Sequence, residues 1–288
     1  MLRKSSPAHS GTYKFSRNYS FHPCFLDSSG MVHSRMMPAD PIVTVLQPHP
    51  TLEAYYAGAS VKRGFLREMF DATAPDYDYV ERLLSFGTGK WYRRQALHRA
   101  GLSAGMKVLD VAVGTGLVAR EEIGIVGQPR FVTGLDPSIG MMRQAVDSLG
   151  IAAVLGVGEQ LPLASERFDF LSMGYALRHL SDLNRAFSEF HRVLKPGGRL
   201  CVLEITAPRG AWGRAILRGY MRNLVPFLTR ITTGRADSQL LWKYYWDTIE
   251  ACLRPESVIK AIEGAGFVDT KHFAELGLFS EYTARKAE

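Results

Sequence analysis

Acidic and small residues whose spacing could bind a nucleotide stand in the middle of the chain. The segment Val108–Gly116 reads Val-Leu-Asp-Val-Ala-Val-Gly-Thr-Gly, and Gly134-Leu-Asp136 ends the next apolar run. Glycines let the backbone approach a ligand closely, because they carry no Cβ atom and accept unusual backbone angles. A carboxylate at the end of a strand, here Asp136, can accept hydrogen bonds from both hydroxyl groups of a ribose. This pattern is typical of the nucleotide site of a doubly wound sheet.

The same residues indicate which nucleotide the site would take. An NAD fingerprint requires Gly-x-Gly-x-x-Gly, whereas this segment reads Ala112-x-Gly114-x-Gly116-x-x-Ala119. Asp110 would repel a pyrophosphate at close range, but it suits the positively charged amino-acid end of S-adenosylmethionine (SAM). A glycine turn without any ligand is the alternative. The residues therefore favour SAM over NAD as the cofactor.

Composition limits the class of protein further. The chain has 288 residues, 46% of them hydrophobic and 22% charged, which is ordinary for one globular catalytic domain with additions. The three cysteines are widely separated and show no metal-binding spacing, so no metal is expected. A net charge of +7 with no focused basic groove does not indicate a nucleic-acid partner. The oligomeric state stays open, a homodimer included.

The composition changes along the chain. Residues 1–50 are rich in Ser, His and Pro, which predicts a leader with little order. A plain leader of a cytoplasmic protein, or an over-long start, is the favoured interpretation. The first thirty residues are basic and resemble a mitochondrial transit segment, which is the alternative. The rest divides into a helical cap, a cofactor-binding core, a helical lid, and a final helix with strands: 51–100, 101–206, 207–254 and 255–288.

Strand and helix patterns alternate through the core. Strands are predicted near 106–111, 130–135, 152–156, 168–173 and 199–205, and helices near 116–123, 138–149 and 182–194. Lys195-Pro-Gly-Gly198 predicts the end of a helix and a tight turn. A helix over 255–265 and an antiparallel pair over 268–273 and 278–284 follow. The predicted fold is an α/β, doubly wound, mostly parallel Rossmann-like seven-stranded sheet with a terminal antiparallel strand, plus N-terminal and inserted helices.

Further motifs flank the nucleotide segment. They are Phe70–Asp78, Leu84–Gly87, Glu159–Leu163, Ala176-Leu-Arg178 and Arg192–Arg199. In combination they resemble the class I SAM-dependent methyltransferases and, more narrowly, the UbiE-type ubiquinone/menaquinone C-methyltransferases, over about residues 65–206. The sequence departs from that family at Val157, where Asp or Asn is usual, and at Glu81, Gly174 and His179.

The residue pattern and the resemblance together give the expected cofactor contacts. They are Tyr77, Asp110, Gly114, Thr115, Gly116, Asp136, Pro137, Met141, Val157, Gly158, Glu159 and Gly174. Asp110 is expected to face the ammonium group of SAM, and Asp136 to hold the ribose. Capping of the helix over 138–149 is the alternative role of Asp136, and the two roles can coexist. Met141 packs on the adenine or simply fills the core.

Two neighbouring residues are the catalytic candidates. The resemblance implies that Arg178 stabilises a phenolate, and His179 has the intrinsic pKa of a general base, although a solvated residue before a helix is an equal alternative. The expected function is transfer of a methyl group from SAM to a small aromatic or quinone-like acceptor, prenylated or not, at a ring carbon. The alternatives are an O- or N-methyltransferase of secondary metabolism, a lipid methyltransferase, and an inactive SAM-binding scaffold in a membrane biosynthetic complex.

A basic segment over 209–235 follows the core. Arg214, Arg218 and Arg222 recur at every fourth position, which predicts one stripe along a helix that Pro226 ends or kinks. Such a helix could be a lid that touches an anionic membrane as a peripheral contact. An ordinary amphipathic helix with solvated arginines is the alternative.

Overall fold

The computed structural model describes residues 45–84, 88–208, 210–227 and 236–288. Most of the expected leader, residues 1–44, and the transit-segment interpretation lie outside the described residues. Residues 45–50, which composition assigns to the leader, contact the core. The backbone N–H of Leu46 donates to Oδ1 of Asp182 at 3.2 Å, and His49 is buried. Residues 45–50 therefore belong to the packed part of the chain and not to the expected leader.

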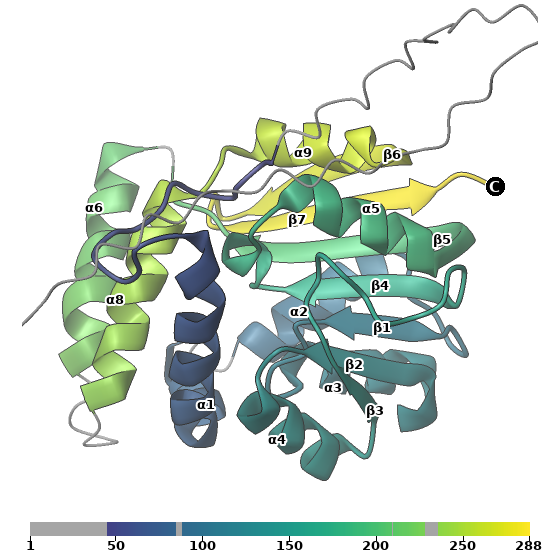
Figure 1. Cartoon of the computed structure of the whole chain (residues 1–288), viewed down its shortest axis with the longest axis horizontal. Coiled ribbons are helices and arrows are strands. Elements are labelled where there is room, and N and C mark those ends of the chain that lie inside the picture. The colour runs from purple at the N-terminus through teal and green to yellow at the C-terminus, as the bar shows by residue number, and fades with distance from the viewer. Residues whose placement is uncertain (1–44, 85–87, 209, 228–235) are drawn as a thin grey trace, which may run out of the picture. The chain divides into compact units, whose positions relative to one another are not determined.

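Seven strands form one sheet in the order β3-β2-β1-β4-β5-β7-β6 (Figure 1). They are β1 (Val108–Val111), β2 (Val132–Asp136), β3 (Ala152–Leu155), β4 (Phe168–Gly174), β5 (Leu194–Ile205), β6 (Phe267–Glu275) and β7 (Phe279–Lys286). Neighbours from β3 to β5 are parallel, and β7 runs antiparallel to both β5 and β6. The predicted fold is confirmed. The strand order reverses between β1 and β4, where the carboxyl ends of a doubly wound sheet open a ligand crevice.

Helices cover both faces of the sheet because the strand side chains are apolar in both directions. One core cluster joins the strands to α5 (Leu183–Val193) and α9 (Pro255–Gly264). The other joins them to α2 (Gly89–Arg99), α3 (Leu117–Val126) and α4 (Ile139–Leu149). All four residues of β1 are buried, as expected of a central parallel strand.

The expected cap over residues 51–100 divides into two parts. The first is α1 (Ala59–Leu84), which contacts α4 and α8 (Ala236–Ala251). The second, α2, packs against α3 because its Ala96 and Leu97 are fully buried in the sheet's core. Residues of α2 therefore belong to the core layer, and only α1 remains beside the site.

The structure places the start of β5 earlier than residue 199. Leu194 pairs with Phe168, but Arg199 pairs with Phe170, so extra residues bulge out of the strand between these two pairs. Gly197 lies in this bulge with φ of 72°. The predicted turn over 195–198 is thus a bulge inside β5, where a proline needs no ladder partner.

Helices α1, α8 and α6 (Ala211–Gly219) stand together at one end of the sheet (Figure 1). Their aromatic and apolar side chains form a third buried cluster that includes Trp242 and Trp246. A π-helix, η3 (Tyr220–Leu224), follows α6. Because a π-helix has more residues per turn, Arg222 is shifted out of the predicted stripe of arginines. Arg218 pairs with Glu250. No helix among the described residues is long and apolar enough to cross a membrane.

Candidate active site

The loop after β1 turns sharply at the carboxyl end of the sheet. Ala112, Gly114 and Gly116 all have positive φ, of 58°, 57° and 91°. A Cβ atom on Gly114 would meet nothing closer than a backbone oxygen at 4.0 Å, so its glycine leaves open space beside the loop. A Cβ on Gly116 would instead lie 2.5 Å from Leu149 Cδ1. Gly114 therefore faces the site, whereas Gly116 lets α3 and α4 pack closely.

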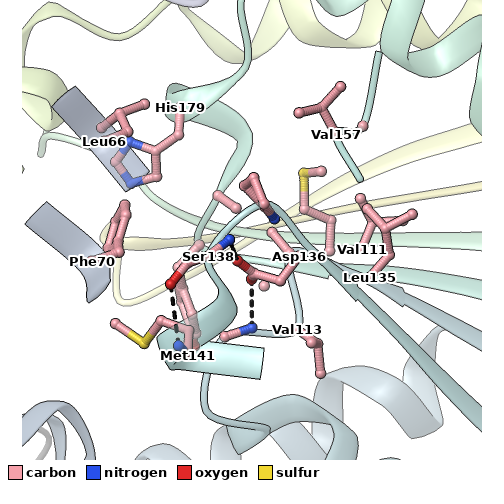
Figure 2. Close-up of a pocket in the computed structure, with 18 of the residues that line it drawn as sticks. Leu66, Phe70, Val111, Val113, Leu135, Asp136, Ser138, Met141, Val157 and His179 are labelled. Carbon is pink, nitrogen blue, oxygen red and sulfur yellow. Dashed lines mark hydrogen bonds between the residues drawn. The ribbon is translucent and has the colours of Figure 1, made fainter. Parts of the chain in front are cut away.

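Asp136 ends β2 and holds two loops with one carboxylate (Figure 2). Its Oδ2 accepts from the N–H of Gly114 at 2.8 Å, and its Oδ1 from the N–H of Ser138 at 2.8 Å. The cap of α4 is Ser138, whose Oγ accepts from the N–H of Met141 at 3.1 Å. Asp136 is thus not the helix cap, and each of its oxygens keeps a lone pair for another donor. Burial raises the pKa of Asp136 to about 6, although its two backbone hydrogen bonds oppose that shift.

A pocket opens between these loops and α1. Eleven of the predicted site residues line it: Tyr77, Gly114, Thr115, Asp136, Pro137, Met141, Val157, Gly158, Glu159, Gly174 and His179. The space not filled by atoms is about 1140 Å³, a figure that includes the open solvent at its mouth. Asp110, Gly116 and Arg178 do not line it.

The walls beside Asp136 suit an adenosine group. Leu135, Met141 and Val157 present apolar side chains to the pocket near the acid (Figure 2). Val157 cannot accept a hydrogen bond from an adenine amino group through its side chain, so the backbone at 157–158 or a neighbouring polar residue such as Glu159 would have to make that contact. An acid for a diol, apolar walls for a base and an open loop at Gly114 together fit SAM.

Asp110 lies behind the loop rather than on the pocket. It is 1% exposed, and its Oδ1 accepts from Ser172 Oγ at 3.2 Å. Ser172 Oγ also lies within hydrogen-bond distance of the fully buried Glu122 on α3, so the two carboxylates share the single hydrogen of this hydroxyl. Among the described residues, one oxygen of each carboxylate has no partner. The predicted contact between Asp110 and the SAM ammonium is not supported by this placement. No sequence pattern indicates that Glu122 is buried beside Asp110.

The buried Asp110–Glu122 pair makes stability depend on pH. Burial and the neighbouring carboxylate raise the pKa of Asp110 well above its ordinary value, and burial raises the pKa of Glu122 to about 7. Groups with raised folded pKa values stabilise the protein fully at low pH, and that stability is lost as pH rises through the folded pKa. We expect the melting temperature to fall between pH 5 and pH 8, and to fall less in Glu122→Gln. The matched control is Glu263→Gln on the exposed face of α9. If the melting temperature fell equally with pH in the wild type, Glu122→Gln and Glu263→Gln, the Asp110–Glu122 pair would not be the cause of the pH dependence.

Polar side chains of α1 fasten it over the pocket. Asp71 Oδ1 accepts from Ser138 Oγ at 2.6 Å and from the N–H of Gly140 at 2.8 Å. Two turns further along the same face of α1, Asp78 accepts from the hydroxyl of Thr115. Tyr77 OH lies 2.9 Å from Tyr245 OH of α8, so this pair of tyrosines joins α1 to α8 beside the pocket.

His179 stands where the pocket meets the aromatic cluster. Its ring stacks on Tyr244 with centroids 5.6 Å apart and meets the edge of Phe70 at 5.3 Å. Nδ1 lies 3.4 Å from Tyr244 OH, while Nε2 is buried and has no partner. Burial first, and then the positive charges of Arg178 and Lys62, lower the pKa of His179 well below its ordinary value. The imidazole is therefore neutral at pH 7 and can accept a proton.

Arg178 is engaged on the far side of this cluster. Its guanidinium is 1% exposed, donates to the Glu204 carboxylate, and lies 4.5 Å from the Tyr245 ring centroid. The backbone N–H of Arg178 also donates to Glu204 Oε2 at 3.3 Å. The predicted contact of Arg178 with a phenolate is not supported by this placement. The guanidinium packs against the ring of Tyr245 instead.

Several pocket residues escaped the sequence-based prediction. Tyr175 lines the pocket with φ of 60°, a left-handed conformation that an aromatic residue rarely adopts and that no sequence pattern reveals. Phe70 stands within a motif named above, whereas Tyr245 belongs to none of those motifs. Arg63 and Arg67 of α1 also line the pocket, one helical turn apart. Amphipathic spacing of α1 could have shown that this face meets the site.

A seven-stranded sheet of this order, with a glycine loop after β1 and an acid after β2, defines a class I SAM-dependent methyltransferase. The model of the ubiE/COQ5 methyltransferase family matches residues 59–282, and the chain belongs to that family.

Individual relatives agree with this assignment. The Geotalea daltonii protein "Ubiquinone/menaquinone biosynthesis C-methyltransferase UbiE" is 31% identical over 77% of this chain and 96% of its own length. The "Demethylmenaquinone methyltransferase" of Chlorobaculum tepidum is 33% identical over 73% of this chain and 87% of its own. A crystal structure of a SAM-dependent methyltransferase from Thermotoga maritima shares the fold, with a TM-score of 0.54, at 20% identity over 77% of this chain and 99% of that one.

Proposed function

We propose that this enzyme methylates a ring carbon of a quinone-like acceptor in its reduced, hydroquinone form. The observation that carries the proposal is the aromatic end of the pocket, where Phe70, Tyr245 and His179 surround space continuous with the Asp136 end. Flat aromatic rings pack well against such side chains. The names of the relatives, which act on quinone precursors, support the same class of acceptor.

The Asp136 end of the pocket would hold the cofactor. Asp136 would accept from the ribose hydroxyls, Met141 and Val157 would flank the base, and backbone near Gly114 would face the methionine part. When bound, SAM supplies an electrophilic methyl group on a sulfonium ion. The protein's own contribution is to align the acceptor with that group and to exclude water, which α1 does through its contacts at Asp71 and Asp78.

His179 would act as the proton acceptor. A hydroquinone ring carbon becomes nucleophilic when the adjacent hydroxyl loses its proton, and the neutral imidazole of His179, which lines the pocket and has no hydrogen-bond partner at Nε2, would take it. The ring carbon then forms a bond to the methyl group, the carbon–sulfur bond breaks with its electron pair left on sulfur, and the ring hydrogen leaves as a proton. Because burial lowers the pKa of His179, it is a weak base that regenerates easily.

The test is a methyl-transfer assay with labelled SAM. Reduced demethylmenaquinone with a short prenyl chain is the main acceptor, and simple phenols, amines and phosphoethanolamine are the comparison. Carbon-methylated hydroquinone, identified by NMR of the product, is the expected result. An O- or N-methylated product would overturn ring-carbon methylation, and SAM binding without transfer to any acceptor would favour the inactive scaffold.

Replacing His179 with glutamine should lower kcat about 100-fold, the low end of what general bases contribute, because its pKa is lowered. The Kd for SAM should change little, since the proton acceptor lies at the acceptor end of the pocket. Initial rates with saturating acceptor measure the effect, and His98→Gln, an exposed residue of α2, is the control. A wild-type kcat in His179→Gln would show that His179 is not the proton acceptor.

A membrane contact through the basic segment belongs to the same proposal. Trp212 and Ile216 lie one turn apart on α6 and are 84% and 71% exposed, and Phe227 is also exposed. Arg214 and Arg222 are exposed nearby. Exposed apolar side chains among arginines are typical of helices that lie on anionic bilayers, and such a surface would deliver a prenylated acceptor.

Sedimentation with vesicles tests this contact. We expect binding to vesicles that contain phosphatidylserine, weaker binding at high salt, and loss of binding in Trp212→Ser/Ile216→Ser. The control is Leu276→Ser, which removes an equally exposed apolar side chain from the β6–β7 turn. Equal binding by all variants would exclude α6 as the contact.

A further inference from the structure

A buried lysine of α1 reaches the loop that carries the catalytic candidates. Lys62 is 5% exposed, and its Nζ donates to the carbonyl oxygen of Leu180 at 2.9 Å. The carbonyl oxygen of Arg178 lies 3.4 Å away, and His49 Nε2 also 3.4 Å. The two carbonyls belong to the residues on either side of His179.

His49 completes the set of acceptors. Its Nδ1 lies 2.7 Å from the carbonyl oxygen of Pro50, so Nδ1 carries the hydrogen and Nε2 presents a lone pair to Lys62. Burial, followed by the charge of Lys62, lowers the pKa of His49 to about 4, which keeps this ring neutral. The three N–H groups of a lysine ammonium thus have three acceptors.

The ammonium of Lys62 stands apart from the reaction itself. Lys62 does not line the pocket, and no carboxylate lies within 4.0 Å of its Nζ among the described residues. Its hydrogen bonds cross from α1 to backbone, so they fix that backbone whatever side chains stand there. Its positive charge also disfavours protonation of His179.

We propose that Lys62 is a positioning residue for His179: its ammonium holds the backbone on both sides of the imidazole and so fixes the position of the ring in the pocket wall. The role of His179 as the proton acceptor rests on the proposed function. The positioning of the ring by Lys62 does not, because it concerns only this chain's own contacts.

The hydrogen bonds from Lys62 to the carbonyls of Arg178 and Leu180, which we call the clamp, depend on pH. Burial lowers the pKa of Lys62 to about 8, against the opposing effects of Glu159 and Cys252. The other charged or titratable groups that face it are His49, which is neutral, and Arg178, which stays charged. Above about pH 8 the amine therefore loses one donor and its charge, and the loop loses part of its anchor. A descending limb in the pH profile of kcat near pH 8 is the expected sign.

The variants Lys62→Met and Lys62→Arg test the proposal in the full-length protein. In Lys62→Met we expect kcat to fall about 10- to 100-fold, with the Kd for SAM nearly unchanged, because a misplaced base costs rate rather than cofactor binding. Its descending limb near pH 8 should disappear. Arginine does not deprotonate in this range, so Lys62→Arg should recover part of kcat and carry no limb near pH 8. Lys260→Met, on the exposed face of α9, is the matched control.

A second measurement does not depend on turnover. Nitrogen-15 NMR of the His179 ring, assigned by its loss in His179→Gln, reports the ring's tautomer and its pKa. Lys62→Met should raise the pKa of His179 and change its ring shifts, while Lys260→Met should not. Unchanged His179 signals, together with a wild-type kcat and pH profile in Lys62→Met, would overturn the proposal. Altered signals in a protein that methylates no acceptor would support the clamp and reject only the proposed function.

Melting curves separate positioning from unfolding. A cooperative transition and normal SAM binding in Lys62→Met show that the variant is folded. If Lys62→Met does not fold, the pH profile of Lys62→Arg is the test. Loss of the fall in kcat near pH 8 would support the clamp, and a fall that remains near pH 8 would count against it.

Discussion

Replacing Asp136 with alanine should weaken SAM binding by about 100-fold or more. The carboxylate is fixed by the N–H groups of Gly114 and Ser138, and its free lone pairs face the pocket. Hydrogen bonds to a charged group contribute about 1.5–3 kcal/mol each, and a ribose offers two. The loss also frees the Gly114 loop, which adds to the effect. Calorimetric titration with SAM measures it.

The same carboxylate predicts how binding depends on pH. Because burial raises the pKa of Asp136 to about 6, the ionised form is lost as pH falls through that value, and SAM should bind about tenfold more weakly one pH unit below it. Asp136→Asn should remove this dependence, and Asp147→Ala on the exposed face of α4 should keep it. Tight binding by Asp136→Ala at every pH would show that the ribose lies elsewhere.

Replacing Arg178 with methionine should destabilise the fold by about 3–5 kcal/mol, because it leaves Glu204 as an unpaired buried charge. Both partners are almost fully buried, and Glu204 also accepts from the N–H of Ile205 at 2.8 Å. Chemical denaturation measures the free energy of unfolding. Arg178→Met/Glu204→Gln should recover part of the loss, and Arg143→Met on exposed α4 should cost almost nothing.

This double variant also separates two roles of Arg178. If the arginine only supports Tyr245 and the loop, the double variant should regain activity along with stability. If it regains stability but stays inactive, the guanidinium acts on the acceptor, and the placement behind Tyr245 must change during the reaction.

Much of the fold was predictable because its signals are local. The glycines of the first loop, the acid after the second strand, and alternating strand and helix patterns determine a doubly wound sheet within short windows of sequence. The start of β5 and the layer to which α2 belongs were not predictable. Both depend on pairing with residues that are distant in sequence, Phe168 for Leu194 and the α3 surface for Leu97.

The site divides in the same way. Asp136 and Gly114 could be named from the chain because their roles follow from their position at strand ends. Arg178 and Asp110 were expected to face ligands. Instead, Arg178 pairs with Glu204, and Asp110 lies beside Glu122. Both partners come from other elements of the chain. Lys62 gave no signal at all, since a lysine in a helix is normally exposed, and only the packing of α1 buries it.

The order of strands also affects how the protein is made. β7 leaves the ribosome after the other six described strands of this sheet, yet it lies inside the sheet, between β5 and β6. During translation the parallel half can assemble while the edge of β5 waits unpaired, and an unpaired edge is where nascent chains associate wrongly. A message cut short before residue 279 would therefore yield a chain with every cofactor motif and an open sheet, which makes it a target for chaperones and proteases rather than a weak enzyme.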